Sequence, residues 1–358
     1  MANALDIFST YTMLATLELV KPETFFFSTR YFPTGAGDIF NSDKVLVEYT
    51  KGDRKMAPFV SERIGAIPVE RNGYQIKEFA PAHIGVSRPM TIDDLKKRGF
   101  GEALYSKTTP AQRALRLQRK DMIELNARIS RRENWMAAQT MINNYCKMQE
   151  MLDAKTEGEA RYIEFYDGKN SEHTYTVAIP WNSKGANIIG DVFTMCQILA
   201  SRGLNATDLV VGSDVADVFY NDEMIARMLD KNSGITFGNI NERIVYPGVT
   251  QIGPLNFRGH WLTIFVDAST YEDEKGVTTP YFPKNAAMVT YPNCGHTMYG
   301  RIDQMPYGSS ELQSIAAKRV PKLVVDNPND TKSLLLKSRP ITVPNTYCPY
   351  IYAANVVS

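Results

Sequence analysis

The stretch that decides the fold runs from Thr108 to Met136 and reads TTPAQRALRLQRKDMIELNARISRRENWM. Thr109 supplies a helix N-cap, and Pro110 follows at the first helical position, where its missing N–H costs nothing. The apolar residues that then recur on one helical face are Leu115, Met122, Leu125, Ile129 and Met136. This spacing predicts one long amphipathic helix.

The polar face of this helix is basic. Residues 113–133 hold seven basic and three acidic side chains, and Glu124 lies four residues from both Lys120 and Arg128. A charged face of this kind is usually solvated, and contact with an acidic neighbour or nucleic acid is the alternative. Three arginines are candidate contacts, namely Arg128, Arg131 and Arg132.

A second apolar stripe follows, and its offset from the first predicts a kink or break at 131–133. Its members are Ala138, Met141, Tyr145, Met148 and Leu152.

Upstream of the helix the pattern changes to strands. Residues 45–49 alternate, and the runs 64–69 and 74–79 flank Asn72-Gly73, a dipeptide typical of a tight hairpin turn. An isolated two-stranded ribbon is marginally stable in water, so we expect this hairpin to need a partner surface. A hairpin resting on its own sheet is the alternative. Its candidate contacts are Arg54, Lys55, Phe59, Arg63, Arg71 and Tyr74.

The first forty residues show short apolar bursts without a sustained period. The run Phe25, Phe26 and Phe27 is the most apolar of these, and we predict an arm that uses it to contact another subunit. An extension lying on its own domain is the alternative.

The remaining pattern predicts mixed α and β structure. We expect a short capped helix at 88–95, a hairpin between 162 and 179, and an α-β-α unit with helices at 188–199 and 214–229 around a strand at 208–212. Further strands are expected at 243–246, 261–267, 286–291, 319–325, 333–337, 340–343 and 350–357.

The composition is that of an ordinary globular protein of 358 residues, with 44% hydrophobic and 22% charged side chains. A balance of 40 basic and 39 acidic residues excludes a uniformly basic nucleic-acid binder. The four cysteines are too widely spaced for a disulfide framework or a zinc site, which predicts reduced thiols. The first twenty residues do not read as a secretory signal, and no apolar run predicts a membrane span, so we expect a cytoplasm-like compartment.

Signs of catalysis are weak. The chain has no phosphate-binding glycine loop, no His-Glu-x-x-His and no Gly-x-Ser-x-Gly. Cys294-Gly295-His296 is best interpreted as a turn, and helix capping accounts for Asp214 and Asp217 near the strand that begins at Asp208. We therefore expect no catalytic residue, metal or cofactor. An α/β enzyme or nucleic-acid-associated protein with its site in 185–303 stays open as the alternative.

A series of short sequence motifs resembles, in the same order along the chain, the lambda-like major capsid protein E family of tailed bacteriophages. In chain order the motifs are Ala57-Pro58-Phe59-Val60-Ser61, Gly73-Tyr74, Phe79-Ala80-Pro81-Ala82-His83-Ile84, Thr91-Ile92-Asp93-Asp94-Leu95, Gly101-Glu102, Tyr281-Phe282-Pro283, Tyr299-Gly300-Arg301-Ile302-Asp303 and Ser338-Arg339-Pro340-Ile341-Thr342-Val343-Pro344. Each motif alone is weak evidence for the family, but together the motifs extend over most of the chain.

The resemblance implies an α+β capsid fold of the Hong Kong 97 type. Its parts would be an N-terminal arm (1–40), an extended loop (41–85), a peripheral domain with a spine helix (86–180 and 305–358) and an axial domain (181–304). It implies self-assembly through hexamers and pentamers into an icosahedral shell around phage DNA, put together in the host cytoplasm. The implied partners are scaffolding and decoration proteins, a portal protein at one vertex, and packaged DNA held by non-specific proximity. The resemblance implies no membrane.

The near-zero net charge conceals opposed regions. Residues 113–133 have a net charge of +4, whereas residues 185–303, with eight basic and thirteen acidic side chains, have −5. We expect this separation to steer subunits during assembly.

Overall fold

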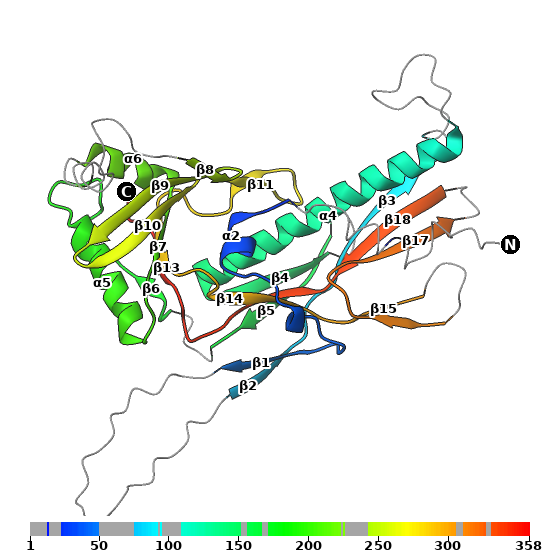
Figure 1. Cartoon of the computed structure of the whole chain (residues 1–358), viewed down its shortest axis with the longest axis horizontal. Coiled ribbons are helices and arrows are strands. Elements are labelled where there is room, and N and C mark those ends of the chain that lie inside the picture. Colours follow the sequence, from blue (N-terminus) through cyan, green and yellow to red (C-terminus); the bar gives the residue numbers. More distant parts are fainter. Residues whose placement is uncertain are drawn as a thin grey trace, which may run out of the picture.

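The long helix α4 organises the molecule, which is known from a computed structural model (Figure 1). The structure describes residues 13, 23–49, 75–91, 94, 109–151, 156–166, 171–222, 225, 243–305, 311–326 and 331–358. Helix α4 spans Pro110–Asn143 and begins in a capping box, in which Thr109 and Gln112 each bond the other's backbone N–H. The helix and its start are confirmed.

The predicted break at 131–133 is wrong, because α4 continues through it and ends only at Asn144. That residue takes a left-handed backbone (φ 62°), which stops the helix and turns the chain into a strand. Strand β4 (Tyr145–Met151) then pairs antiparallel with β5 (Glu157–Glu164). The second apolar stripe is therefore divided between helix and strand.

A seven-stranded mixed sheet lies at one end of α4 (Figure 1). Its strands, in spatial order, are β6 (Thr174–Tyr175), β20 (Ile351–Ala353), β13 (Ala287–Thr290), β7 (Asp208–Gly212), β10 (His260–Asp267), β9 (Val249–Phe257) and β8 (Arg243–Tyr246). The predicted hairpin between 162 and 179 is wrong, since β5 pairs with β4 and β6 pairs parallel with β20. The predicted strand at 350–357 is shortened to β20.

Alternation along β7 divides the core into two layers. Leu209 and Val211 face a cluster with α5 (Ile188–Ser201) and α6 (Ser213–Asn221), whereas Val210 faces a cluster with α2 (Phe26–Arg30) and α4. Because successive strand residues point to opposite sides, one buried strand serves both layers. The expectation that Asp214 caps α6 is wrong, because the N-cap residue is Gly212 and Asp214 accepts a hydrogen bond from the Ser213 hydroxyl.

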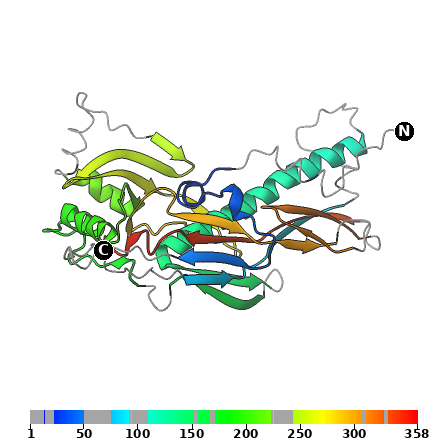
Figure 2. The same cartoon turned by 60° about the horizontal axis from the view of Figure 1, so that its bottom comes forward.

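Smaller sheets lie along one side of the rest of α4, as the turned view shows (Figure 2). One of them has three strands, which are β17 (Val320–Asp326), β18 (Thr331–Ser338) and β3 (Ile84–Met90). The two-stranded sheets pair β1 (Val45–Tyr49) with β2 (Gln75–Phe79), β14 (Gly295–Tyr299) with β19 (Pro340–Pro344), β15 (Ile302–Gln304) with β16 (Gln313–Ile315), and β11 (Thr270–Glu272) with β12 (Thr278–Pro280). A 3-10 turn, η1, spans Ala36–Asp38. None of the helices in the described part of the chain is long and apolar enough to cross a membrane.

The helix predicted at 88–95 is wrong over its first half. Arg88 and Met90 lie in β3, which pairs with β18 along seven positions. The capping signal belongs to the residues that follow, because Thr91 and Asp94 bond one another's backbone N–H groups just after the strand. The partner strand, which lies far away in sequence, overrides the local helix pattern.

We predict that Gly295→Ala loosens the N-terminal segment. A Cβ at position 295 would meet the Phe32 ring and lie 2.6 Å from the Val343 carbonyl oxygen, so the packed ring has to move. Overpacking of this kind costs roughly 1–3 kcal/mol. Urea unfolding of the unassembled subunit measures the loss. Gly85→Ala, where nothing lies within 4 Å, is the matched control and should be neutral. Equal stability of the two variants would contradict the prediction.

Asp267 at the end of β10 predicts a pH dependence. It is 3% exposed; its Oδ1 accepts bonds from the Ser269 N–H and hydroxyl, and its Oδ2 has no partner in the described structure. Burial raises the pKa of this carboxyl to about 6. Because the folded state takes up the proton more readily, the group adds stability below its unfolded pKa, and this contribution is lost as the pH rises through 6.

The expected gain in the free energy of unfolding between pH 7 and pH 4 is about 2 kcal/mol. Wild type and Asp267→Asn should therefore differ in the slope of unfolding free energy against pH over this window. Asp214→Asn, at an exposed carboxyl on α6, serves as control and should follow wild type. Parallel curves for wild type and Asp267→Asn would refute the assignment.

Candidate functional site

The segment after residue 23 packs on its own chain. Phe26 and Phe27 of α2 are buried, and their rings contact Phe265 of β10 and Phe282 respectively, with ring centroids 5.3 and 6.2 Å apart. Phe25 is half-buried at the N-cap of α2. Of the two interpretations of the arm, the extension on its own domain describes residues 25–27, and Phe26 and Phe27 keep almost no surface for a neighbouring subunit.

An ion pair fastens this segment to the sheet. Arg30 binds Asp208 with both ends of its guanidinium, at 2.6 and 3.0 Å, and stacks over Phe265 at 4.5 Å. The Tyr31 hydroxyl lies 3.1 Å from the same carboxylate. Burial, and to a lesser extent the negative charge of Asp208, raises the pKa of this tyrosine. Asp208 lies at one end of a strand, where an α/β enzyme would place a catalytic carboxylate. In this structure the charge of that carboxylate is neutralised by Arg30.

The base of the predicted extended loop is well anchored. Val45 of β1 is opposite Phe79 of β2, both are buried, and Phe79 packs edge-on against Phe165. Arg339 holds the two ends of this base together, because it donates to the Asp43 carboxylate at 3.0 Å and to the Pro81 carbonyl at 2.9 Å. In Figure 2, β1 and β2 lie at the edge of the body.

The other loop candidates lie outside the described residues. They are Arg54, Lys55, Phe59, Arg63, Arg71 and Tyr74. The strand predicted at 74–79 is found as β2, but its partner is β1, while the run 64–69 also lies outside the described part.

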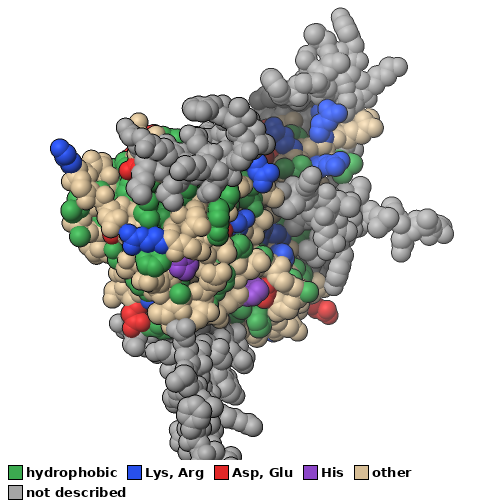
Figure 3. Space-filling view, turned by 60° about the vertical axis from the view of Figure 1, so that its left-hand side comes forward, with side chains coloured by type: hydrophobic (Ala, Val, Ile, Leu, Met, Phe, Trp, Pro, Cys, Tyr) green, Lys and Arg blue, Asp and Glu red, His purple; other side chains and the backbone are tan. Residues whose placement is uncertain are grey.

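Two of the three helix candidates are engaged within the subunit. Arg131 lies 3.5 Å from Glu23, and Arg132 pairs with Glu274 of the β11–β12 turn and stacks on Trp135. Trp135 also donates to the Tyr271 hydroxyl at 3.0 Å, so the β11–β12 hairpin is tied to α4. Arg128 is exposed. In Figure 3, Lys and Arg side chains gather at the upper right of the face shown, among hydrophobic ones.

A buried ion pair that sequence reasoning missed crosses the middle of α4. Arg319 donates to both carboxylate oxygens of Glu133 at 2.7 Å and to Asn126 Oδ1 at 3.0 Å. Burial lowers the pKa of Arg319, but Glu133 more than compensates and raises it. No local pattern points to this pair, because its members lie 186 residues apart and each sits among other charged residues.

The pair forms one wall of a groove of about 710 Å³ between the N-terminal segment, α4 and the chain before β17. Polar side chains line much of it, among them Glu23, Ser28, Asn126, Ser130 and Lys318. The Arg319 guanidinium in the wall is held by Glu133, Asn126 and Ser130, so its place in the groove is structural.

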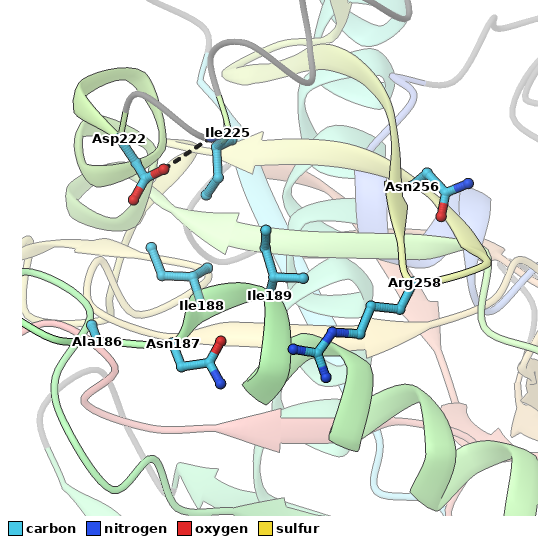
Figure 4. Close-up of a pocket in the computed structure, with 8 residues that line it drawn as sticks. All are labelled: Ala186, Asn187, Ile188, Ile189, Asp222, Ile225, Asn256 and Arg258. Carbon is cyan, nitrogen blue, oxygen red and sulfur yellow. Dashed lines mark hydrogen bonds between the residues drawn. The ribbon is translucent and has the colours of Figure 1, made fainter.

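A second hollow, of about 420 Å³, lies where α5 begins (Figure 4). Ile188, Ile189 and Ile225 form its apolar part, and Arg258 extends from the β9–β10 turn toward the first residues of α5. Asn187 caps α5 by accepting from the Gly190 N–H at 3.0 Å. The hollow thus combines a capped helix end with one exposed arginine.

The side chains of Cys294 and His296 in the Cys294-Gly295-His296 triplet have structural roles. Cys294 is fully buried, and burial raises the pKa of its thiol to about 12, which keeps it protonated at neutral pH. His296 Nδ1 lies 3.3 Å from the Asp38 carboxylate. Among the residues that the structure describes, no group of three or more His, Cys, Asp or Glu could hold a metal ion.

Several solved structures with a similar fold are described as capsid or phage-related proteins. A putative capsid protein of a prophage in E. coli CFT073 is 14% identical, covers 96% of this chain and 98% of its own, and superposes with a TM-score of 0.66. A phage-related protein from Bordetella bronchiseptica RB50 is 10% identical with 97% of both chains covered and a TM-score of 0.49. The mature capsid of bacteriophage PhiM1 is 13% identical over 93% of this chain and 88% of its own, with a TM-score of 0.48. No curated protein sequence matches.

The first of these similarities confirms the expected α+β capsid fold of the Hong Kong 97 type. The family model for phage major capsid protein E matches residues 9–351, which is nearly the whole sequence. The chain therefore belongs to the phage major capsid protein E family.

Proposed function

We propose that this capsid protein forms an icosahedral phage head shell by assembling into hexamers and pentamers around the packaged DNA. The observation that carries the proposal is the match of fold and family over almost the full length of the chain. The role is structural, since the family is one of capsid proteins. We further propose assembly in the host cytoplasm without a membrane, with scaffolding and decoration proteins, a portal at one vertex and only non-specific proximity to DNA.

The proposed division of labour follows the chain. Residues 1–40 would be the arm, 41–85 the extended loop, 86–180 with 305–358 the peripheral domain, and 181–304 the axial domain. Helices α5 and α6 and strands β7 to β10 all fall within the last range, which supports it. Strands β6 and β20 join the same sheet from outside that range, so the chain crosses between the two proposed domains more than once.

The anchored base of the loop supports an intersubunit role for the residues beyond it. Arg339 fixes the chain just before β1 and just after β2, and the Val45–Phe79 pair fixes the strands themselves. A rigid base sets the direction in which the loop leaves the body. Many modest contacts between copies, each weak alone, can then close a shell by multivalency.

Negative-stain electron microscopy tests the shell directly. The expressed chain, alone and with its scaffolding partner, is expected to form closed particles of uniform diameter with capsomers of sixfold and fivefold symmetry. The alternative, an enzyme or nucleic-acid-associated protein with its site in 185–303, predicts a small soluble species. A monomer or dimer under every condition would refute the shell.

Removal of residues 54–71, with a short glycine-serine turn in their place, is expected to leave soluble subunits or isolated capsomers and no closed shells. The deletion spares β1 and β2, so the Val45 and Phe79 contacts of the core remain. Sedimentation separates capsomers from shells. Lys44→Ala, which removes only an exposed ion pair with Glu78 at the loop base, is the control and should give normal shells. Normal shells from the deletion would show that the loop is no brace between subunits.

A further inference from the structure

The N-terminal half of α4 carries an exposed stripe that the described part of its own subunit leaves uncovered. We define the 115–123 stripe as Leu115, Arg116, Arg119, Lys120 and Ile123, all of which are exposed. Leu115 is 40% exposed and Ile123 44%, and Arg119 lies between them at four-residue spacing. Residues four apart lie on the same helical face, so apolar and cationic side chains alternate along about 12 Å of the surface.

The stripe flanks the packed side of the helix. Met122, Leu125 and Ile129 pack against Leu323 and Leu334 of the β17–β18–β3 sheet. The stripe begins beside them at Leu115, seven residues before Met122, and continues round the helix to Lys120. Leu115 and Ile123 are not members of this packed cluster, and the exposed part of each side chain is available to a partner.

The cations of the stripe are poorly compensated. Arg88 of β3 takes up the two acidic side chains of this half of the helix, with its Nη1 atom 2.9 Å from Asp121 and in contact with Glu124. Glu124 is also 3.8 Å from Lys120. Arg116 and Arg119 form no ion pair with any residue that the structure describes, so the stripe presents net positive charge.

We propose that the 115–123 stripe docks an acidic amphipathic helix from another protein. Nucleic acid would be attracted by the arginines alone, and the aliphatic side chains would give it nothing. A helix with two apolar residues two turns apart and with Asp or Glu beside them would satisfy both features, since it would cover Leu115 and Ile123 and pair with Arg116 and Arg119.

The shell role does not enter this argument, because the stripe is defined on the isolated subunit. Docking and assembly can therefore fail separately: a chain that binds the helix but forms no shells would refute only the proposed function, and the reverse result only this inference.

The test uses the full-length unassembled protein and a fluorescent 18-residue peptide helix with leucines seven residues apart flanked by glutamates. Fluorescence anisotropy is expected to show saturable binding at low salt that weakens as NaCl is added. The double variants Leu115→Ser/Ile123→Ser and Arg116→Gln/Arg119→Gln should each weaken it at least about tenfold, which corresponds to about 1.4 kcal/mol. Thermal unfolding confirms that the variants are folded.

Two matched controls lie elsewhere on the surface. Arg128→Gln removes an exposed arginine from the same helix, and Ile244→Ser removes an isoleucine of β8 that is 78% exposed. Both should bind the peptide like wild type. A peptide with lysines in place of the glutamates should not bind.

A double-stranded DNA probe gives the competing result. If DNA binds and only the arginine variant abolishes it, while the glutamate peptide fails to bind or the Leu115/Ile123 variant binds the peptide normally, the stripe is a nucleic-acid contact and the proposal is overturned. Equal loss of peptide binding in the two controls would overturn it as well.

Discussion

The bidentate ion pair between Glu133 and Arg319 lies at the point where the surroundings of α4 change. Toward the N-terminus of the helix, Leu125 and Ile129 pack on the β17–β18–β3 sheet, and toward the C-terminus Ala137 and Met141 pack on the seven-stranded sheet. A helix of about 51 Å cannot be covered by one small sheet, so separate clusters share it. Removing one partner of such a buried pair leaves an uncompensated charge and costs roughly 3–5 kcal/mol.

Polar ties of the same kind recur wherever distant parts of the chain meet. Arg30 with Asp208 joins the N-terminal segment to the sheet, Arg339 joins both ends of the loop base to the start of β19, and Arg132 with Glu274 joins the β11–β12 hairpin to α4. Arginine suits this task because its planar fork binds two acceptors at once and fixes their relative positions. The apolar clusters are thus held in register by a few directional contacts.

The sequence predicted well those elements whose signals are local. The start of α4 follows from Thr109-Pro110, and the strand at 208–212 follows from a short apolar run, because both signals lie within a few residues. The end of α4 was missed, since a left-handed asparagine at 144 leaves no trace in the apolar spacing. The hairpin predicted between 162 and 179 failed because β5 pairs with the preceding strand β4, while β6 pairs with β20. The first half of the helix predicted at 88–95 failed because its strand partner β18 lies far away in the sequence. The Glu133–Arg319 pair and the Arg339 anchor were invisible for the same reason.

All four cysteines, at 146, 196, 294 and 348, are buried, and burial raises the pKa of each thiol. In a shell, every feature of one subunit's surface is repeated in each copy, so a single reactive thiol would become a whole array of them. Such an array would join neighbouring particles through disulfides once they left a reducing cell. Keeping each sulfur protonated and out of contact with solvent lets the assembled particle pass between reducing and oxidising surroundings without changing its covalent structure.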